Sequence, residues 1–268
     1  MEHYICITCG TQYPAAPRQP AACQICTDDR QYVNSKGQAW TTLEALSASH
    51  RNIMRALEPG LTGIRTEPQI AIGQQAHLIQ SERGNVLWDC ISFIDDPTIQ
   101  AVRALGGIRA IGISHPHFYS SMVEWSHAFN APIYLHASNR EWVMRPDPAV
   151  VYWEGETYSL GDGLTLVRCG GHFPGSTVLH WATGAEGRGA LFTGDTINVV
   201  ADRRYVSFLY SYPNQIPLPA PAIRGIVNAV EPFEFDRIYG GWLDSVVRSE
   251  AKAGVRFSAE RYLRAIQG

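Results

Sequence analysis

Hydrophobic residues after about residue 64 fall in short runs separated by glycine, proline and charged residues. Two of these runs flank the segment 82–85, "ERGN", and predict a β-hairpin whose second strand ends at Asp89. Apolar strand-like runs then alternate with helical patterns at 95–107, 122–129 and 140–145. Consecutive strands follow. The segment 220–242 then has the pattern of a helix followed by a strand, and an amphipathic helical pattern at 249–267 closes the chain. This order predicts two sheet-rich halves with helices outside, an α+β four-layer αβ/βα sandwich.

Helix starts are marked at two positions. Thr41 and Thr42 precede apolar residues that recur at roughly helical intervals as far as Ile53, and this pattern favours a helix there. Either Asp95 or Asp96, just before Pro97, is placed to cap the next helix.

The first 33 residues differ from the rest of the chain, because they carry few aliphatic residues and four of the six cysteines. Cys6, Cys9, Cys23 and Cys26 form two Cys-x-x-Cys pairs, the spacing of a four-thiolate zinc site. A segment this polar needs a bound metal for stability. We therefore expect a zinc-ribbon-like knuckle at 1–33 and a second domain at 34–268. Iron in a rubredoxin-like knuckle is the alternative.

Charge and hydropathy exclude several classes of partner. Lys and Arg number 22 against 25 Asp and Glu, and no basic cluster stands out, so a nucleic-acid partner is not expected. No apolar stretch reaches 18 residues, and the first residues lack the pattern of an export signal. The sequence predicts a soluble cytoplasmic protein that acts on a small molecule.

Four predicted strands end in side chains that can bind a metal. Asp89 closes "NVLWD", His115 and His117 follow "AIGIS", His172 follows "LVRCGG", and Asp195 closes "LFTGD". Imidazole nitrogens with one carboxylate suit Zn²⁺ or a divalent iron or manganese ion. The ends of strands are also where α/β folds place their chemistry. We therefore predict a metal site with His115, His117, His172 and Asp195 as ligands.

The stretches "SHPHFYSS", "GGHFPGSTVLHW" and "LFTGDT", in this order, resemble the metallo-β-lactamase superfamily over about residues 64–245. The resemblance implies a metal between the two halves of the sandwich and, in most members, hydrolysis by metal-held hydroxide. It also implies that the three histidines form the first metal pocket and that Asp195 is the bridging carboxylate. By the same resemblance, Asp89 does not bind the metal itself but accepts a hydrogen bond from a ligand histidine.

The chain departs from the superfamily pattern at three positions. Tyr119 and Ser120 stand where the usual His-x-His-x-Asp-His run has Asp and His, and Gly241 stands where another histidine is usual. All three belong to the second metal pocket, so we predict a mononuclear site. Tyr119 and Ser120 then have two roles open to them: they hydrogen-bond a substrate carbonyl or its oxyanion, or they only fill the vacated pocket.

The function predicted is a metal-dependent hydrolase of an ester, thioester or lactone. One alternative is a mononuclear iron oxygenase of the persulfide-dioxygenase type, for which His115, His172 and Asp195 would form the ligand triad. Another is a catalytically degenerate binding module whose knuckle contacts a partner or a second copy in a homo-oligomer. Trp242 and the proline-rich loop 210–221 are candidates to line the substrate cleft, the loop as a lid or as an ordinary connection.

Overall fold

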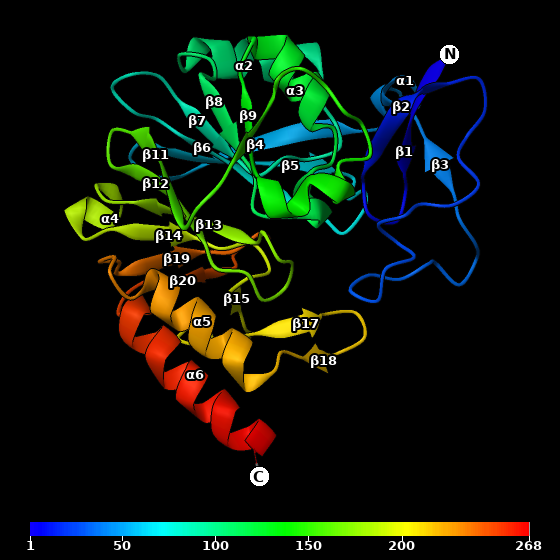
Figure 1. Ribbon diagram of the computed structural model, residues 1–268. Coiled ribbons are helices and arrows are strands. Elements are labelled where there is room, and N and C mark those ends of the chain that lie inside the picture. The colour runs from blue at the N-terminus through cyan, green and yellow to red at the C-terminus, as the bar shows by residue number, and fades with distance from the viewer. Residues whose placement is uncertain (268) are drawn as a thin grey trace.

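The computed structural model describes residues 1–267 and contains two mixed β-sheets packed face to face (Figure 1). The first sheet has seven strands in the order β10-β9-β8-β7-β6-β5-β4. Their bounds are β4 Arg51–Glu58, β5 Leu61–Glu67, β6 Gln75–Ile79, β7 Val86–Trp88, β8 Ala110–Gly112, β9 Ile133–His136 and β10 Val150–Trp153.

The second sheet has six strands in the order β11-β12-β13-β14-β19-β20. Their bounds are β11 Thr157–Gly161, β12 Leu164–Arg168, β13 Thr177–Trp181, β14 Ala190–Phe192, β19 Arg237–Tyr239 and β20 Val246–Val247. Two small hairpins follow β14, namely β15 Asn198–Val199 with β16 Val206–Ser207 and β17 Leu209–Ser211 with β18 Ile216–Pro217.

Helices cover the outer face of each sheet, which gives four layers (Figure 1). Helices α2 (Asp96–Ala104) and α3 (Met122–Phe129) pack on the first sheet, where Val102 and Trp125 share a core with Ile111. Helices α5 (Ala220–Val230) and α6 (Ala251–Gln267) cover the second sheet. Short helical turns are α4 Gly184–Gly187, η1 Pro116–Phe118 and η2 Ala137–Trp142. A third apolar core, which includes Trp88 and Phe192, joins the two sheets.

The N-terminal segment forms a small unit beside the sandwich, drawn in blue in Figure 1. Its sheet has the order β2-β1-β3, with β1 Glu2–Cys6, β2 Gln12–Ala16 and β3 Trp40–Thr41. Because β3 pairs with β1 through Ile5 and Thr41, this sheet extends past residue 33. The backbone N–H of Gln12 donates to the carbonyl of Ser120 at 3.1 Å, so the unit is docked onto the sandwich.

The four-layer sandwich preceded by a small knuckle is confirmed, and so is the hairpin of β6 and β7 around 82–85. The helix predicted after Thr42 is present and capped by Thr42, but its predicted extent as far as Ile53 is wrong. Helix α1 spans only Leu43–Ser47, and Ile53 lies in β4, where it pairs with Arg65 of β5. Pairing along a whole strand outweighs a weak helical pattern. Among the described residues, no helix is both long and apolar enough to cross a membrane.

The two sheets bring their strand ends to one edge of the sandwich. Strands β7 and β8 are parallel, so the residues that follow both of them lie at the same end. Strands β14 and β19 are also parallel, which places Asp195 and Gly241 at a common end of the second sheet. The backbone N–H of Thr177 donates to the carbonyl of Ser114 at 2.9 Å and links the two halves there. The fold therefore delivers the predicted ligands to one place.

Candidate metal centre

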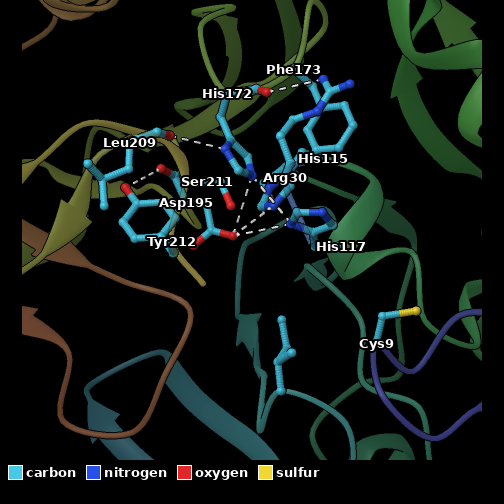
Figure 2. Close-up of polar contacts among 12 residues, drawn as sticks. Cys9, Arg30, His115, His117, His172, Phe173, Asp195, Leu209, Ser211 and Tyr212 are labelled. Atoms are coloured by element: carbon cyan, nitrogen blue, oxygen red, sulfur yellow. Dashed lines mark hydrogen bonds and ion pairs between the residues drawn. The ribbon is translucent and has the colours of Figure 1, made fainter. Parts of the chain in front are cut away.

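The His-x-His pair lies in the turn directly after β8. His115 has an extended backbone, and Pro116 then begins the 3₁₀ turn η1 that contains His117. The proline fixes φ and needs no hydrogen-bond acceptor, which suits the first position of a helical turn. Both imidazoles are buried. Figure 2 shows the two rings directed toward the same point as the His172 ring and the Asp195 carboxylate.

His172 comes from the loop between β12 and β13. Gly171 before it has φ +79°, and a Cβ there would lie 2.7 Å from Cδ1 of Ile226. Only glycine allows the backbone to pass this close to α5 in this conformation. His172 Nδ1 donates to the carbonyl of Leu209 at 3.2 Å, which leaves the lone pair of Nε2 directed into the cluster.

The four predicted ligands converge. The candidate ligand atoms of His115, His117, His172 and Asp195 all lie within 4.8 Å of one another. Asp195 Oδ2 is 3.1 Å from His115 Nε2, 3.6 Å from His117 Nδ1 and 3.7 Å from His172 Nε2. Ligands about 2.0–2.1 Å from a tetrahedral zinc ion are about 3.4 Å apart. The observed spacing fits a single divalent cation.

The surroundings of the cluster favour neutral imidazoles and an ionised Asp195 carboxylate, the protonation states that bind a metal. Burial lowers the pKa of His115 to about 4, although its hydrogen bond with Asp195 opposes the shift. Burial also holds the pKa of His172 well below its usual value. Burial by itself would raise the pKa of Asp195, but its hydrogen bonds with His115 and His117 outweigh that effect and keep the pKa below its ordinary range. Neutral imidazoles beside a carboxylate are what a divalent cation binds.

Asp89 supports the site indirectly. Its Oδ1 accepts a hydrogen bond from the backbone N–H of Ser114 at 2.7 Å, and the Ser114 hydroxyl pairs with His115 Nδ1 at 2.9 Å. Asp89 therefore acts on His115 through Ser114, one residue further away than the resemblance implies. Burial raises the pKa of Asp89 to about 8, with the Ser114 hydrogen bonds opposing the shift.

The region of the second metal pocket is filled by an aromatic ring. A Cβ on Gly241 would lie 2.4 Å from Cζ of Phe118, so no larger residue fits at 241 without moving that ring. Phe118 packs in turn against His115, with ring centroids 5.2 Å apart, and against Trp242 at 5.8 Å. The space beside Gly241 therefore contains a packed aromatic ring and no metal-ligating side chain from position 241.

Tyr119 and Ser120 lie elsewhere, against the N-terminal unit. Both are buried, and with Gln12 they line a small gap beneath that unit. The Ser120 hydroxyl accepts a hydrogen bond from Gln74 Nε2 at 3.3 Å, and its carbonyl accepts one from Gln12. Neither residue is among the described residues that line the cavity beside the metal ligands. Ser120 adopts a left-handed conformation with φ 45°.

The four N-terminal cysteines form a second, separate cluster. Their sulfurs lie within 4.8 Å of one another, with Cys6 and Cys26 at 3.5 Å and Cys9 and Cys23 at 3.5 Å. Thiolates about 2.3 Å from a tetrahedral zinc ion are about 3.8 Å apart, so the cluster fits one ion. Gln38 Nε2 donates to Cys6 at 3.1 Å, and such donors stabilise metal-bound thiolates.

A cavity of about 240 Å³ opens beside the ligands His117, His172 and Asp195. Trp242 lines it, and so does Tyr212 from the proline-rich loop. Sequence reasoning missed the other wall, which consists of residues 30–32 directly after the last cysteine pair. No local signal marks this segment, since the Arg30 guanidinium meets the His172 carbonyl across 142 positions of sequence. The only available clue was its position after the knuckle.

Comparisons with known proteins agree with this architecture. The family model described as "Metallo-beta-lactamase superfamily" matches residues 71–242. A protein of Bacillus subtilis (strain 168) named "Uncharacterized protein YmaE" is 50% identical over 268 residues, which covers 99% of this chain and 97% of the relative.

Two solved structures share the fold at low sequence identity. The structure of VMB-1 has a TM-score of 0.61 at 12% identity and covers 81% of this chain and 98% of its own. The metallo-beta-lactamase FIM-1 from Pseudomonas aeruginosa, in its mono-zinc form, has a TM-score of 0.59 at 16% identity and covers 78% and 95%. Because the family model spans more than half of the sequence, this chain belongs to the metallo-beta-lactamase superfamily.

Proposed function

We propose that this protein is a hydrolase that uses one divalent cation to cleave a small ester, thioester or lactone. The observation that carries the proposal is the convergence of His115, His117, His172 and Asp195 beside an open cavity. Membership of a superfamily whose members are mostly hydrolytic supports the reaction class. Zinc is the metal we propose at both clusters, and the cytoplasm is the compartment we propose.

The aromatic filling of the second pocket supports a single ion. Phe118 leaves no room for a side chain at position 241, and Tyr119 and Ser120 line the small gap beneath the N-terminal unit. Three imidazoles are enough to hold one catalytic zinc ion and leave a position for water or substrate, and Asp195 lies beside them either to bind the ion or to orient that water.

A divalent cation held by these residues supplies Lewis-acid activation of water near neutral pH. The side chains of the protein orient the attacking water. Asp195 Oδ2 contacts all three histidines, whereas its Oδ1 is buried without a hydrogen-bond partner among the described residues. That oxygen is an acceptor for a proton of the attacking water. Tyr212 donates to the Asp195 carbonyl at 2.8 Å and holds the main chain in place.

The test compares two histidine variants for metal content and turnover. His172→Ala removes a ligand, so we expect elemental analysis to fall from two ions per chain to one. We expect turnover of ester, thioester and lactone substrates to fall about a hundredfold or more. His127→Ala is the matched control, since His127 is exposed and pairs only with Asp147. It is expected to keep both ions and full turnover.

Three results would contradict the hydrolase. Unchanged turnover in the His172→Ala protein would show that hydrolysis does not use this site. Iron at the histidine cluster, with oxygen consumed in the presence of glutathione persulfide and no hydrolysis, would establish the oxygenase instead. A protein that retains both ions but turns over none of these substrates would be a binding module.

A further inference from the structure

The N-terminal unit contributes one wall of the cavity at the histidine cluster. Arg30, Gln31 and Tyr32 line this space together with His117, His172 and Asp195. The wall comes from the segment that leaves Cys26, so the four-cysteine cluster anchors it at one end. The unit is therefore part of the binding site and not only an appendage.

Arg30 fixes this wall in place. Its Nε and one terminal nitrogen donate to the two carboxylate oxygens of Asp28 at 2.6 and 2.9 Å. Its other terminal nitrogen donates to the His172 carbonyl at 3.3 Å, and the guanidinium lies 3.9 Å from the centre of the Phe173 ring. Figure 2 shows Arg30 beside Phe173 with its contact to His172. The guanidinium is committed to these partners, so Arg30 is a positioning residue.

Hydrogen bonds from Asn214 and within the segment also fix the main chain of residues 28–31. Asn214 Nδ2 donates to the carbonyls of Asp29 and Gln31 at 3.0 and 3.1 Å. The backbone N–H of Gln31 donates to the Asp28 carbonyl at 3.0 Å. Its main chain is bonded on both sides, so Gln31 lines the cavity from a fixed position.

The Gln31 side chain has unused hydrogen-bonding capacity. The residue is 4% exposed, and within residues 1–267 its Oε1 has no hydrogen-bond partner. A buried acceptor without a partner is costly, and such groups in folded proteins are usually satisfied. Because Gln31 lines the cavity, a bound molecule with an N–H or O–H group can satisfy it.

The rest of the lining favours an uncharged ligand. Apart from the metal ligands, Arg30 is the one charged residue among the described residues that line the cavity, and Asp28 neutralises it. Ile72, Tyr212 and Trp242 add apolar surface. A carboxylate or ammonium group on the ligand would lose its hydration without gaining a free counter-charge.

We propose that Gln31 determines substrate specificity and selects a small neutral acyl compound with a hydrogen-bond donor near the reacting carbonyl. The proposal rests on the proposed function for the identity of the reacting group. It assigns the four-cysteine unit a direct part in recognition. Replacing Gln31 should therefore change which ligands bind without removing metal from either cluster.

Binding of alkyl hydroxamic acids to the zinc-loaded full-length protein tests this. The probes are hydroxamic acids with a hydroxyl group on carbon 2, 3 or 4, each paired with the analogue that has methyl in its place, and succinic monohydroxamic acid as the anionic probe. Calorimetry gives each dissociation constant. We expect one hydroxyl probe to bind about tenfold more tightly than its methyl analogue, the contribution of one good hydrogen bond. The anionic probe should bind more weakly than either.

Gln31→Leu should reduce the ratio of the two dissociation constants, methyl analogue over hydroxyl probe, to about one. Gln24→Leu is the matched control, because it makes the same change at an exposed position of the same unit and should keep the ratio. Unchanged metal content and circular dichroism establish that both variants are folded. An unchanged ratio in the Gln31→Leu protein, no hydroxyl preference in the parent protein, or no hydroxamate binding at all would overturn the role of Gln31.

Ester turnover, measured separately, distinguishes the two proposals. Hydrolysis without any hydroxyl preference refutes the role of Gln31 and leaves the hydrolase intact. A hydroxyl preference that depends on Gln31, without hydrolysis of any ester, thioester or lactone, refutes the hydrolase and leaves the binding role of Gln31 intact.

Discussion

The contact between Gly241 and Phe118 shows how a single aromatic residue leaves no room for a metal-ligating side chain at position 241. Gly241→Ala would place a methyl group 2.4 Å from Cζ of Phe118 and push that ring toward His115. Overpacking of this kind costs about 1–3 kcal/mol of unfolding free energy. We expect urea denaturation to show a loss in that range.

Gly225→Ala is the matched control for this prediction. Gly225 lies in α5, and a Cβ there meets nothing within 4 Å. Removing an exposed glycine from a helix interior should stabilise the protein by about 1 kcal/mol. If Gly241→Ala were as stable as the parent protein, Phe118 would not be excluding a side chain from position 241.

His77 predicts an acid-sensitive step in stability. It is buried and packs against Phe192 and Tyr239, and burial lowers its pKa to about 3. The unfolded chain, with a histidine pKa of about 6.5, then binds more protons than the folded chain between those two values. The stability that neutral His77 provides is therefore present above pH 6.5 and is lost as the pH falls toward 3.

Replacing His77 should flatten this dependence. Between pH 7 and pH 5 the parent protein should lose about 2 kcal/mol more unfolding free energy than His77→Gln. His115 and His172 titrate in both proteins, so the difference between the two pH profiles isolates His77. Parallel profiles would show that His77 is protonated in the folded state or that it becomes hydrated.

At the scale of the element, the start of α2 depends on one side chain. Asp95 Oδ1 accepts a hydrogen bond from the backbone N–H of Thr98 at 2.9 Å, so Asp95 and not Asp96 is the cap. Asp95→Ala should cost about 1 kcal/mol in urea denaturation. Asp96→Ala removes only a charge from the first turn and should cost a few tenths of a kcal/mol. Equal losses would contradict this assignment.

Helices and strands differ in how well the residues within them predict their type and bounds. Helix α3 has the bounds that its apolar pattern predicts, because its buried face is a local periodic signal. Strand β4 does not, because it exists through pairing with β5, and seven of its eight residues carry polar or helix-favouring side chains, Ile53 being the exception. In β4 the local pattern favours a helix, but pairing with β5 makes the segment a strand.

For the whole molecule, the cysteine cluster and the histidine cluster should be coupled through the segment 28–33. Changing Cys6 and Cys26 together to serine should remove the cysteine-bound ion, so that elemental analysis gives one ion per chain in place of two. Because Asn214 bonds Asp29 and Gln31, amide hydrogen exchange should accelerate both in 28–33 and in 210–215.

Cys169→Ser is the control, since this half-buried thiol lies outside both clusters and its replacement should leave the ion count and the exchange unchanged. If exchange in 210–215 did not respond to loss of the cysteine-bound ion, the unit would not depend on its metal for docking.

The sequence by itself determined the layers of the fold, the ligands His115, His117, His172 and Asp195, and the four cysteines of the knuckle. These features follow from local pattern, because strand periodicity, glycine turns and ligand spacing are written in neighbouring residues. Only the tertiary structure decided that Phe118 packs against Gly241, that Tyr119 and Ser120 line a gap beneath the knuckle, and that Gln31 lines the cavity. Each of these depends on contacts between segments far apart in the chain, which no local periodicity encodes.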